Sequence, residues 1–202
     1  MLSVAVQAGG QSSRMGENKA LKPFLGRPLI ERVVRRVNSV ADEMLITTNQ
    51  SGAFDFLGIR QESDVRPGLG PLGGLYTALA AARLPTVAVV ACDMPFANAP
   101  LLVASAGILL KDDADVVIAR SLEGYEPLHA VYRRTTCLPA IESALDSGQL
   151  RVISWFPGVR VRHLTDEELD RYDPERIAFL NVNTPEEFAR AEEYASAEGR
   201  PS

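Results

Sequence analysis

Short apolar runs alternate along this chain with stretches of helical spacing, and this alternation restricts the possible folds more than any other feature. Three runs rich in apolar and β-branched residues are typical of strands buried on both faces: Ser3–Ala8, Glu43–Thr48 and Thr86–Cys92. Between the first two, apolar residues recur at steps of three and four after Pro28, which predicts a helix over 28–37. Strands that alternate with helices form crossover units. We therefore expect an α/β fold in which helices cover both faces of a predominantly parallel central sheet.

The same pattern continues to the end of the chain. Helices are predicted over Gly70–Leu84, Leu101–Leu110 and Thr136–Leu145, and further strands over Asp115–Ala119, Pro127–Tyr132 and Ile177–Asn181. Thr184 is typical of a helix N-cap, because Pro185 suits the first helical position and Glu187 lies three residues after the cap. Residues from about 195 to 202 are expected to be frayed. Because 46% of the 202 residues are hydrophobic, enough for one core, we expect residues 1–202 to form a single domain.

Charge and cysteine content exclude several classes of protein. The chain carries 21 Lys and Arg against 26 Asp and Glu, a net charge of −5, which argues against a broad basic surface for nucleic acid. Cys92 and Cys137 are too few for a disulfide scaffold or a four-thiolate zinc site, and their apolar surroundings favour buried thiols. The chain has neither a run of about 18 apolar residues nor the start of a signal peptide. We expect a cytoplasmic protein that binds neither membrane nor nucleic acid.

Glycine-rich segments follow two of the predicted strands, where an open parallel sheet binds its ligands. In Gly9–Lys19, glycines let backbone amides approach an anion, and Arg14 and Lys19 add positive charge. The spacing is neither that of the P-loop nor that of the dinucleotide fingerprint, which disfavours those two classes. A surface turn with two solvated cations is an equally good interpretation of the spacing alone. The second segment, Pro67–Gly74, is a shaped loop before a helix or a simple chain reversal.

Polar side chains follow two further predicted strands. Asp93 comes directly after the most strand-like run, where a carboxylate suits Mg²⁺, which takes one or two carboxylates plus substrate phosphates. Asn183 follows the last predicted strand and would reach the same metal or phosphate. The alternative is that Asp93 caps a turn and that Asn181 and Asn183 serve only the turn and the helix cap.

Together these segments resemble the nucleotidyltransferase superfamily and, within it, the molybdenum cofactor guanylyltransferases. The most specific motif is A-G-G-x-S-x-R-M-G followed by a lysine, at Ala8–Lys19; the others, in order, are GPLGGL, CDMPF, EPLHAVY and LNVNTPEE. The resemblance extends from Val4 to about Ala191. It implies a three-layer α/β/α, Rossmann-like nucleotidyltransferase fold.

The resemblance also implies roles for individual residues. Residues that would bind GTP are Gln7, Ala8, Gly9, Gly10, Lys19, Asn49, Asp64 and Asp93. Asp93 would also hold Mg²⁺, and Arg14, Lys19 and Asp93 would be the catalytic residues. Residues that would bind molybdopterin are Arg151, Asn181 and Asn183. The chain departs from the family twice, with Gln7 where the family usually has Leu and Asn18 where it usually has Asp.

The reaction that the resemblance implies needs little beyond these groups. A terminal phosphate of molybdenum-bound molybdopterin (Mo-molybdopterin) would attack the α-phosphorus of GTP, and pyrophosphate would leave. Because the nucleophile is already an anion, in-line positioning and cationic stabilisation by Mg²⁺, Lys19 and Arg14 suffice without a strong base. His129 lies in a predicted strand and is expected to be a core or wall residue rather than a base. His163 is expected to be exposed.

Several alternatives stay open at this point. The chain could be a CTP-using molybdopterin cytidylyltransferase, a sugar-phosphate nucleotidyltransferase, or a nucleotide-binding regulator without catalysis. A salt bridge is as good an interpretation of Arg151 as a contact with substrate phosphate, and Trp155–Phe156 is expected to pack in the core rather than to stack on a pterin. Besides GTP and Mo-molybdopterin, the reaction implies transient partners that deliver or receive the cofactor.

Overall fold

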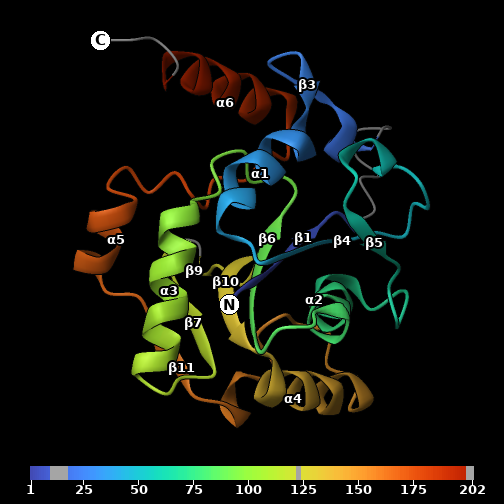
Figure 1. The fold of residues 1–202 in the computed structure, drawn as a ribbon, viewed down its shortest axis with the longest axis vertical. Helices are drawn as coiled ribbons and strands as arrows, with labels where there is room; N and C mark the ends of the chain where they lie inside the picture. The colour runs from blue at the N-terminus through green and yellow to red at the C-terminus, as the bar shows by residue number, and fades with distance from the viewer. Residues whose placement is uncertain (10–17, 122–123, 199–202) are drawn as a thin grey trace.

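The computed structural model describes residues 1–9, 18–121 and 124–198, and its centre is a seven-stranded sheet. The strand order is β11-β7-β10-β6-β1-β4-β5 (Figure 1). β10 runs antiparallel to both of its neighbours, and every other pair is parallel. The strands of this sheet are β1 (Ser3–Gln7), β4 (Glu43–Thr47), β5 (Arg60–Glu62), β6 (Thr86–Ala91), β7 (Val116–Ile118), β10 (His129–Arg133) and β11 (Val161–His163).

Helices cover both faces of the sheet, as the alternation of the sequence predicts. The helices are α1 (Leu29–Val37), α2 (Gly70–Ala81), α3 (Ala99–Lys111), α4 (Arg134–Asp146), α5 (Asp166–Tyr172) and α6 (Pro185–Glu198). α1 and α3 pack in one hydrophobic cluster, and α2 and α4 in the other. Two short hairpins lie outside the sheet: β2 (Pro23–Phe24) with β3 (Arg27–Pro28), and β8 (Arg120–Ser121) with β9 (Gly124–Tyr125). The three-layer α/β/α prediction is confirmed.

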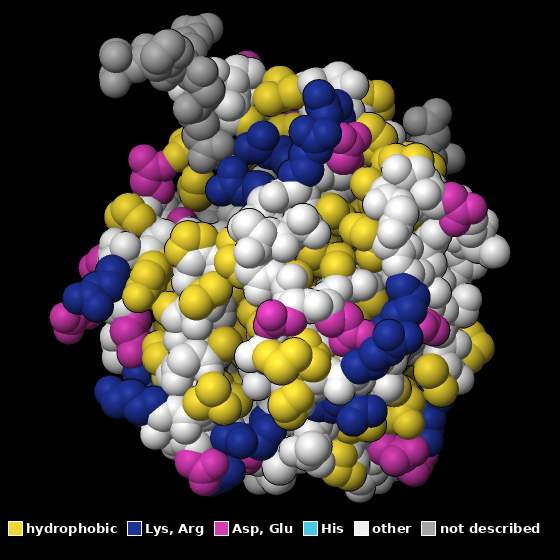
Figure 2. All heavy atoms as spheres, viewed as in Figure 1, with side chains coloured by type: hydrophobic (Ala, Val, Ile, Leu, Met, Phe, Trp, Pro, Cys, Tyr) yellow, Lys and Arg dark blue, Asp and Glu magenta, His cyan; other side chains and the backbone are white. Residues whose placement is uncertain are grey.

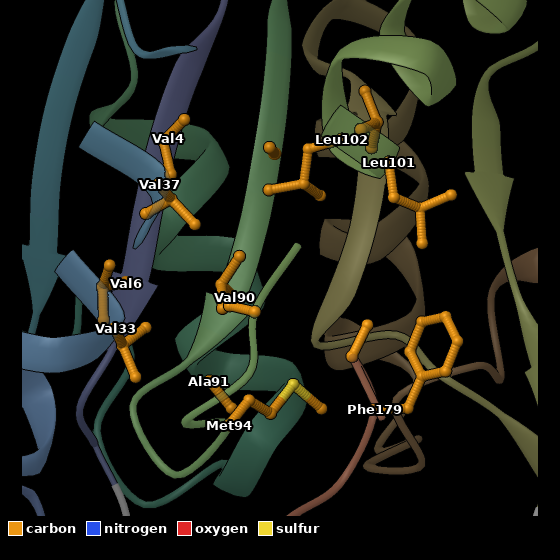
Figure 3. Packing of buried hydrophobic residues seen from close by; sticks show 14 of the residues in the cluster. Val4, Val6, Val33, Val37, Val90, Ala91, Met94, Leu101, Leu102 and Phe179 are labelled. Atoms are coloured by element: carbon orange, nitrogen blue, oxygen red, sulfur yellow. The ribbon is translucent and has the colours of Figure 1, made fainter. Parts of the chain in front are cut away.

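The central strands are apolar throughout because each contributes side chains to both faces. On β1, Val4 and Val6 lie on the α1 side, where Figure 3 shows them beside Val33 and Val37 of α1. Ala5 belongs to the cluster on the α2 and α4 side. All five residues of β1 are buried. Since side chains alternate along a strand, the last residue, Gln7, projects toward α2 as Ala5 does.

The predicted strand over Ile177–Asn181 is wrong. These residues form a turn, because the buried Asp173 carboxylate accepts hydrogen bonds from the backbone N–H groups of Ile177 and Ala178. The N–H of Leu180 then donates to the carbonyl of Ile177 at 3.0 Å. Backbone groups used in this way cannot pair with a neighbouring strand. Ala178 and Phe179 are buried all the same, but in a loop, and Leu180 is exposed.

Residues 195–198, the described part of the segment expected to be frayed, are helical. α6 continues to Glu198, and Ala195 is buried in a third cluster with Phe24 and Phe188. The predicted cap of this helix is present, since Thr184 Oγ1 accepts the N–H of Glu187 and the Glu187 carboxylate accepts the N–H of Thr184. Within the described residues, no helix is both long and apolar enough to cross a bilayer.

Candidate functional site

Three side chains from separate motifs meet beyond the carboxyl ends of β1 and β6. Lys19 Nζ donates a hydrogen bond to Asp93 Oδ2 at 2.7 Å and another to Asn183 Oδ1 at 2.8 Å. Lys19 begins the short 3-10 helix η1 (Lys19–Leu21), Asp93 follows β6, and Asn183 precedes α6. The side chains of Lys19 and Asp93 are 12% and 24% exposed, so both keep some contact with solvent. Lys19 therefore brings the side chains of Asp93 and Asn183 to the same point.

Local capping holds Lys19 in place. Asn18 is the N-cap of η1, and its Oδ1 accepts the N–H of Ala20 at 3.0 Å. Its Nδ2 donates to Gln50 Oε1 at 2.5 Å, which ties η1 to the loop after β4. An amide can do both because it carries a donor and an acceptor, whereas a carboxylate at this position would only accept. The departure at residue 18 therefore leaves Lys19 in a well-defined setting.

The asparagine loop before α6 is attached to the Asp93 segment by its backbone. The N–H of Val182 donates to the carbonyl of Asp93 at 3.0 Å. The N–H of Asn183 donates to the carboxylate of Glu187 at 2.6 Å, so the helix cap holds the backbone of Asn183 as well. These two contacts leave the side chain of Asn183 to meet Lys19.

Two arginines of α1 fasten the loop that carries Asp93. Arg32 Nε donates to the carbonyl of Pro95 at 2.8 Å, and Arg36 Nε donates to that of Ala97 at 3.0 Å. The Arg32 guanidinium also lies over the ring of Phe96, 5.4 Å from its centroid. Figure 2 shows Lys and Arg side chains gathered at the top of the view, over α1 and β3. Arg32 and Arg36 therefore support the site by holding this loop.

Asn49 and Asp64 form a second polar group, beyond the carboxyl ends of β4 and β5. Asn49 Nδ2 donates to Asp64 Oδ2 at 2.6 Å, and the N–H of Asp64 donates back to Asn49 Oδ1 at 3.0 Å. The reciprocal pair fixes the start of the loop that leads into α2. Two residues separated by fifteen positions are thus brought together, at the same edge of the sheet as Lys19.

Neighbouring strands engage backbone groups of Gln7 and Ala8 in hydrogen bonds. The carbonyl of Gln7 accepts the N–H of Cys92 at 3.0 Å, and the N–H of Ala8 donates to the carbonyl of Thr47 at 2.8 Å. Ala8 and Gly9 are half-buried, and a Cβ at Gly9 would meet nothing within 4 Å. Among the described residues of this segment, Gly9 therefore has the space for a backbone contact to a ligand.

Other predicted site residues stand apart from this group or lie outside the described residues. Gly10 and Arg14 belong to the latter. The exposed Arg151 follows α4, and in the part of the chain that the structure describes it has no ion pair, so the salt-bridge alternative is not observed there. Asn181 Nδ2 donates to the carbonyl of Phe179 at 3.3 Å. Neither Arg151 nor Asn181 contacts Lys19.

Burial shifts the pKa values of two groups near the site, Cys92 and His129. Burial and, to a smaller extent, the neighbouring Asp93 carboxylate together raise the pKa of the Cys92 thiol to about 12. Burial also lowers the pKa of His129 to about 4, so its ring is neutral near pH 7. His129 Nε2 accepts the N–H of Asn98 at 3.0 Å, and its ring packs against Phe179. The prediction that His129 is a wall of the core is confirmed.

Sequence reasoning missed three contacts at this edge of the sheet. Gln50 holds Asn18, Gly74 leaves room for the Gln7 side chain, and Thr47 lies beside Gln7 on the neighbouring strand. Spacing carries no signal for these contacts, since each joins segments that only the packing of the layers brings together.

The fold has three α/β/α layers, and a lysine and a carboxylate pair beyond the ends of its strands, after a glycine-rich segment. These features define the class of protein as an α/β nucleotidyltransferase. The chain belongs to the family with a MobA-like NTP transferase domain, whose model matches residues 4–162.

Relatives of known name agree with this family. A molybdenum cofactor guanylyltransferase of Desulfosudis oleivorans is 36% identical, over 93% of this chain and 92% of its own length. A probable molybdenum cofactor guanylyltransferase of Carboxydothermus hydrogenoformans is 35% identical, over 94% of each chain. Among solved structures, molybdopterin-guanine dinucleotide biosynthesis protein A of Archaeoglobus fulgidus superposes with a TM-score of 0.84 at 27% identity, over 96% of this chain and 99% of that one.

Proposed function

We propose that this protein transfers GMP from GTP to Mo-molybdopterin, with release of pyrophosphate, and so forms the molybdopterin guanine dinucleotide cofactor. The observation that carries the proposal is the contact of Lys19 with both Asp93 and Asn183 at the ligand-binding edge of the sheet. The names of relatives that align over more than nine-tenths of the chain support the choice of substrates. We further propose that residues 1–202 act as one domain in the cytoplasm.

The oxygen donors at the site fit Mg²⁺. Asp93 offers a carboxylate and Asn183 an amide oxygen, both of the hard type that Mg²⁺ takes. Among the described residues, no three His, Cys, Asp or Glu side chains gather as a metal site. With these two oxygens from the protein, water and substrate phosphates would fill the remaining positions, as is usual for Mg²⁺. Bound there, the ion would neutralise phosphate charge as the pyrophosphate leaves.

The protein's own residues would bind and orient the triphosphate. Lys19 already donates to two oxygens, so a phosphate oxygen of GTP would replace one of them without a change in the position of the ammonium. The neutral His129 and the protonated Cys92 offer no base. None is needed, because a phosphate monoester attacks as an anion. Catalysis then depends on alignment and on fixed positive charge.

The remaining residues take their proposed roles from the resemblance. Arg14 is a second catalytic cation, and residues that contact the nucleotide beside Lys19 and Asp93 are Gln7, Ala8, Gly9, Gly10, Asn49 and Asp64. Arg151, Asn181 and Asn183 face the pterin substrate. Proteins that deliver or accept the finished cofactor are transient partners.

One assay separates the proposal from its alternatives. The protein is incubated with Mg²⁺, Mo-molybdopterin and each nucleoside triphosphate in turn, and released pyrophosphate is measured. We expect release with GTP and little with CTP. Release with CTP alone would identify a cytidylyltransferase, release only when a sugar phosphate replaces Mo-molybdopterin would identify a sugar-phosphate enzyme, and no release with any pair would favour a binding protein.

A further inference from the structure

The side chain of Gln7 is a polar group buried between the sheet and α2. It is 5% exposed, at the last residue of β1. Its Nε2 donates to the carbonyl of Pro71, in the first turn of α2, at 3.3 Å. A Cβ at Gly74, one turn further along the helix, would lie 2.2 Å from that Nε2 and 2.7 Å from the amide carbon. Gln7 therefore sets how closely this turn approaches the sheet, and Gly74 is the residue that permits it.

Two buried oxygens at this place lack partners. Neither Gln7 Oε1 nor Thr47 Oγ1 takes part in a hydrogen bond among the described residues. Gln7 and Thr47 are direct neighbours in the register of β1 and β4. An unpaired buried oxygen lowers the free energy of unfolding, and an apolar side chain of the same shape would avoid that loss. A polar Gln7 is thus hard to explain by stability alone.

Gln7 also touches the other segments of the site. Its carbonyl accepts the N–H of Cys92, the residue before Asp93, and Ala8 and Gly9 follow it in the chain. Its side chain reaches the first turns of α2, which form the third segment at this edge. A shift of the first turn of α2 would move the helix N-terminus, whose N–H groups favour anions.

We infer that Gln7 is a positioning residue for the nucleotide, which holds the first turn of α2 in register with the Asp93 segment. The inference rests on the proposed function, since it assigns the turn a place beside bound GTP. A merely structural role makes a different prediction: replacement of Gln7 would change the stability of the protein and leave the KM for GTP as it was.

The contact itself is tested without substrate, by thermal unfolding of Q7A, G74A and the double variant Q7A/G74A. We expect G74A alone to lower Tm, because the new methyl group collides with the Gln7 amide. In the Q7A background the same substitution should cost little, since those atoms are absent and alanine favours the helix. Additive changes in Tm would overturn the contact.

The positioning role is tested by Q7L against the matched variant T47V. Both remove an unpaired oxygen at the same register, but only Q7L removes a hydrogen bond to α2. We expect Q7L to raise the KM for GTP by about tenfold with kcat within about twofold and Tm not lowered, and T47V to leave KM within about twofold. An unchanged KM in Q7L, or an equal rise in T47V, would overturn the inference. A wild-type protein that releases no pyrophosphate from GTP would count against the proposed function, while the unfolding cycle would still decide the contact.

Discussion

Two charged clusters lie at opposite edges of the same sheet. At the carboxyl edge, Lys19 joins Asp93 and Asn183. At the amino edge, Asp115 directly precedes β7 and Arg160 directly precedes β11, and Arg133 ends the antiparallel strand β10. The carboxyl edge carries the candidate site, and the ion pairs of the amino edge connect the starts of neighbouring strands.

The two clusters differ in how fully their charges are paired. Asp115 is 7% exposed and accepts hydrogen bonds from the backbone, Nε and Nη2 of Arg160 and from Thr136. The bonds from Arg160 hold the pKa of Asp115 near 2, although burial alone would raise it. Lys19 instead has two acceptors, which come from loops 74 and 164 residues away. The Asp115 cluster, whose hydrogen-bonding groups are fully paired, stabilises the fold. The Lys19 cluster is built from loops, so Lys19 can exchange one of its acceptors for a ligand.

The largest effect that this comparison predicts is the loss of activity in Asp93→Ala. We expect pyrophosphate release to fall by about 1,000-fold or more, because the carboxylate that contacts Lys19 and would hold Mg²⁺ is removed. Tm should change little, since the Asp93 backbone still accepts the N–H of Val182. The same two measurements on Asp115→Asn should give the opposite pattern. Retained turnover in Asp93→Ala would remove Asp93 from the metal role.

Lys19→Met should give the next largest effect. The side chain keeps its apolar stem and loses its ammonium, so kcat/KM should fall by about 100-fold, as for other lost transition-state charges. The matched control is Arg83→Met, because the Arg83 side chain is 75% exposed and belongs to the amino edge. Steady-state assays with GTP measure both. Equal losses in the two variants would mean that general surface charge, and not the position of Lys19, supports the reaction.

The substitution Asp115→Asn tests the amino edge through the pH dependence of the free energy of unfolding. The pKa of Asp115 is lowered from 3.8 to about 2, so the folded state is stabilised above pH 3.8 and loses that stabilisation as the pH falls toward 2. At pH 6 the variant should lose about 2 kcal/mol of unfolding free energy. Urea unfolding across pH 2–6 would measure it, and the difference from wild type should vanish at the acid end. A constant difference across this range would contradict the assigned pKa.

Local rules predicted much of the fold. The strands β1, β4 and β6 and the cap of α6 at Thr184 follow from apolar runs and from residues within one turn of each other. The antiparallel direction of β10 has no local signal. The strand predicted over Ile177–Asn181 fails because Asp173, outside the segment, captures its N–H groups.

The candidate site divides in the same way. Motifs placed Lys19 and Asp93 at the carboxyl edge, because parallel strands end there together. Asn183 reaches this edge without a strand before it, through the hydrogen bond from the Val182 N–H to the Asp93 carbonyl. They did not predict that Gln50 supports Asn18, or that Gln7 meets Gly74. Those contacts depend on the distance of α2 and of the loops from the sheet. That distance is set by packing between the layers, which no spacing in the sequence encodes.

The smallest effect should come from Asn183. In Asn183→Ala, Lys19 loses one neutral acceptor and keeps Asp93, so kcat/KM should fall by about threefold to fivefold, as for one exposed hydrogen bond. Tm should not change, because the N–H of residue 183 still reaches Glu187.

Asn183→Asp sharpens the comparison further. A second carboxylate would pair more fully with Lys19 and make the carboxyl edge resemble the amino edge. It should therefore lower kcat/KM more than the alanine variant does, by about tenfold, because the added charge competes with substrate phosphate. Titration of both variants with Mg²⁺ in the pyrophosphate assay distinguishes this from a metal effect. If Asn183→Asp were as active as wild type, incomplete pairing of Lys19 would not be what keeps this edge available to a ligand.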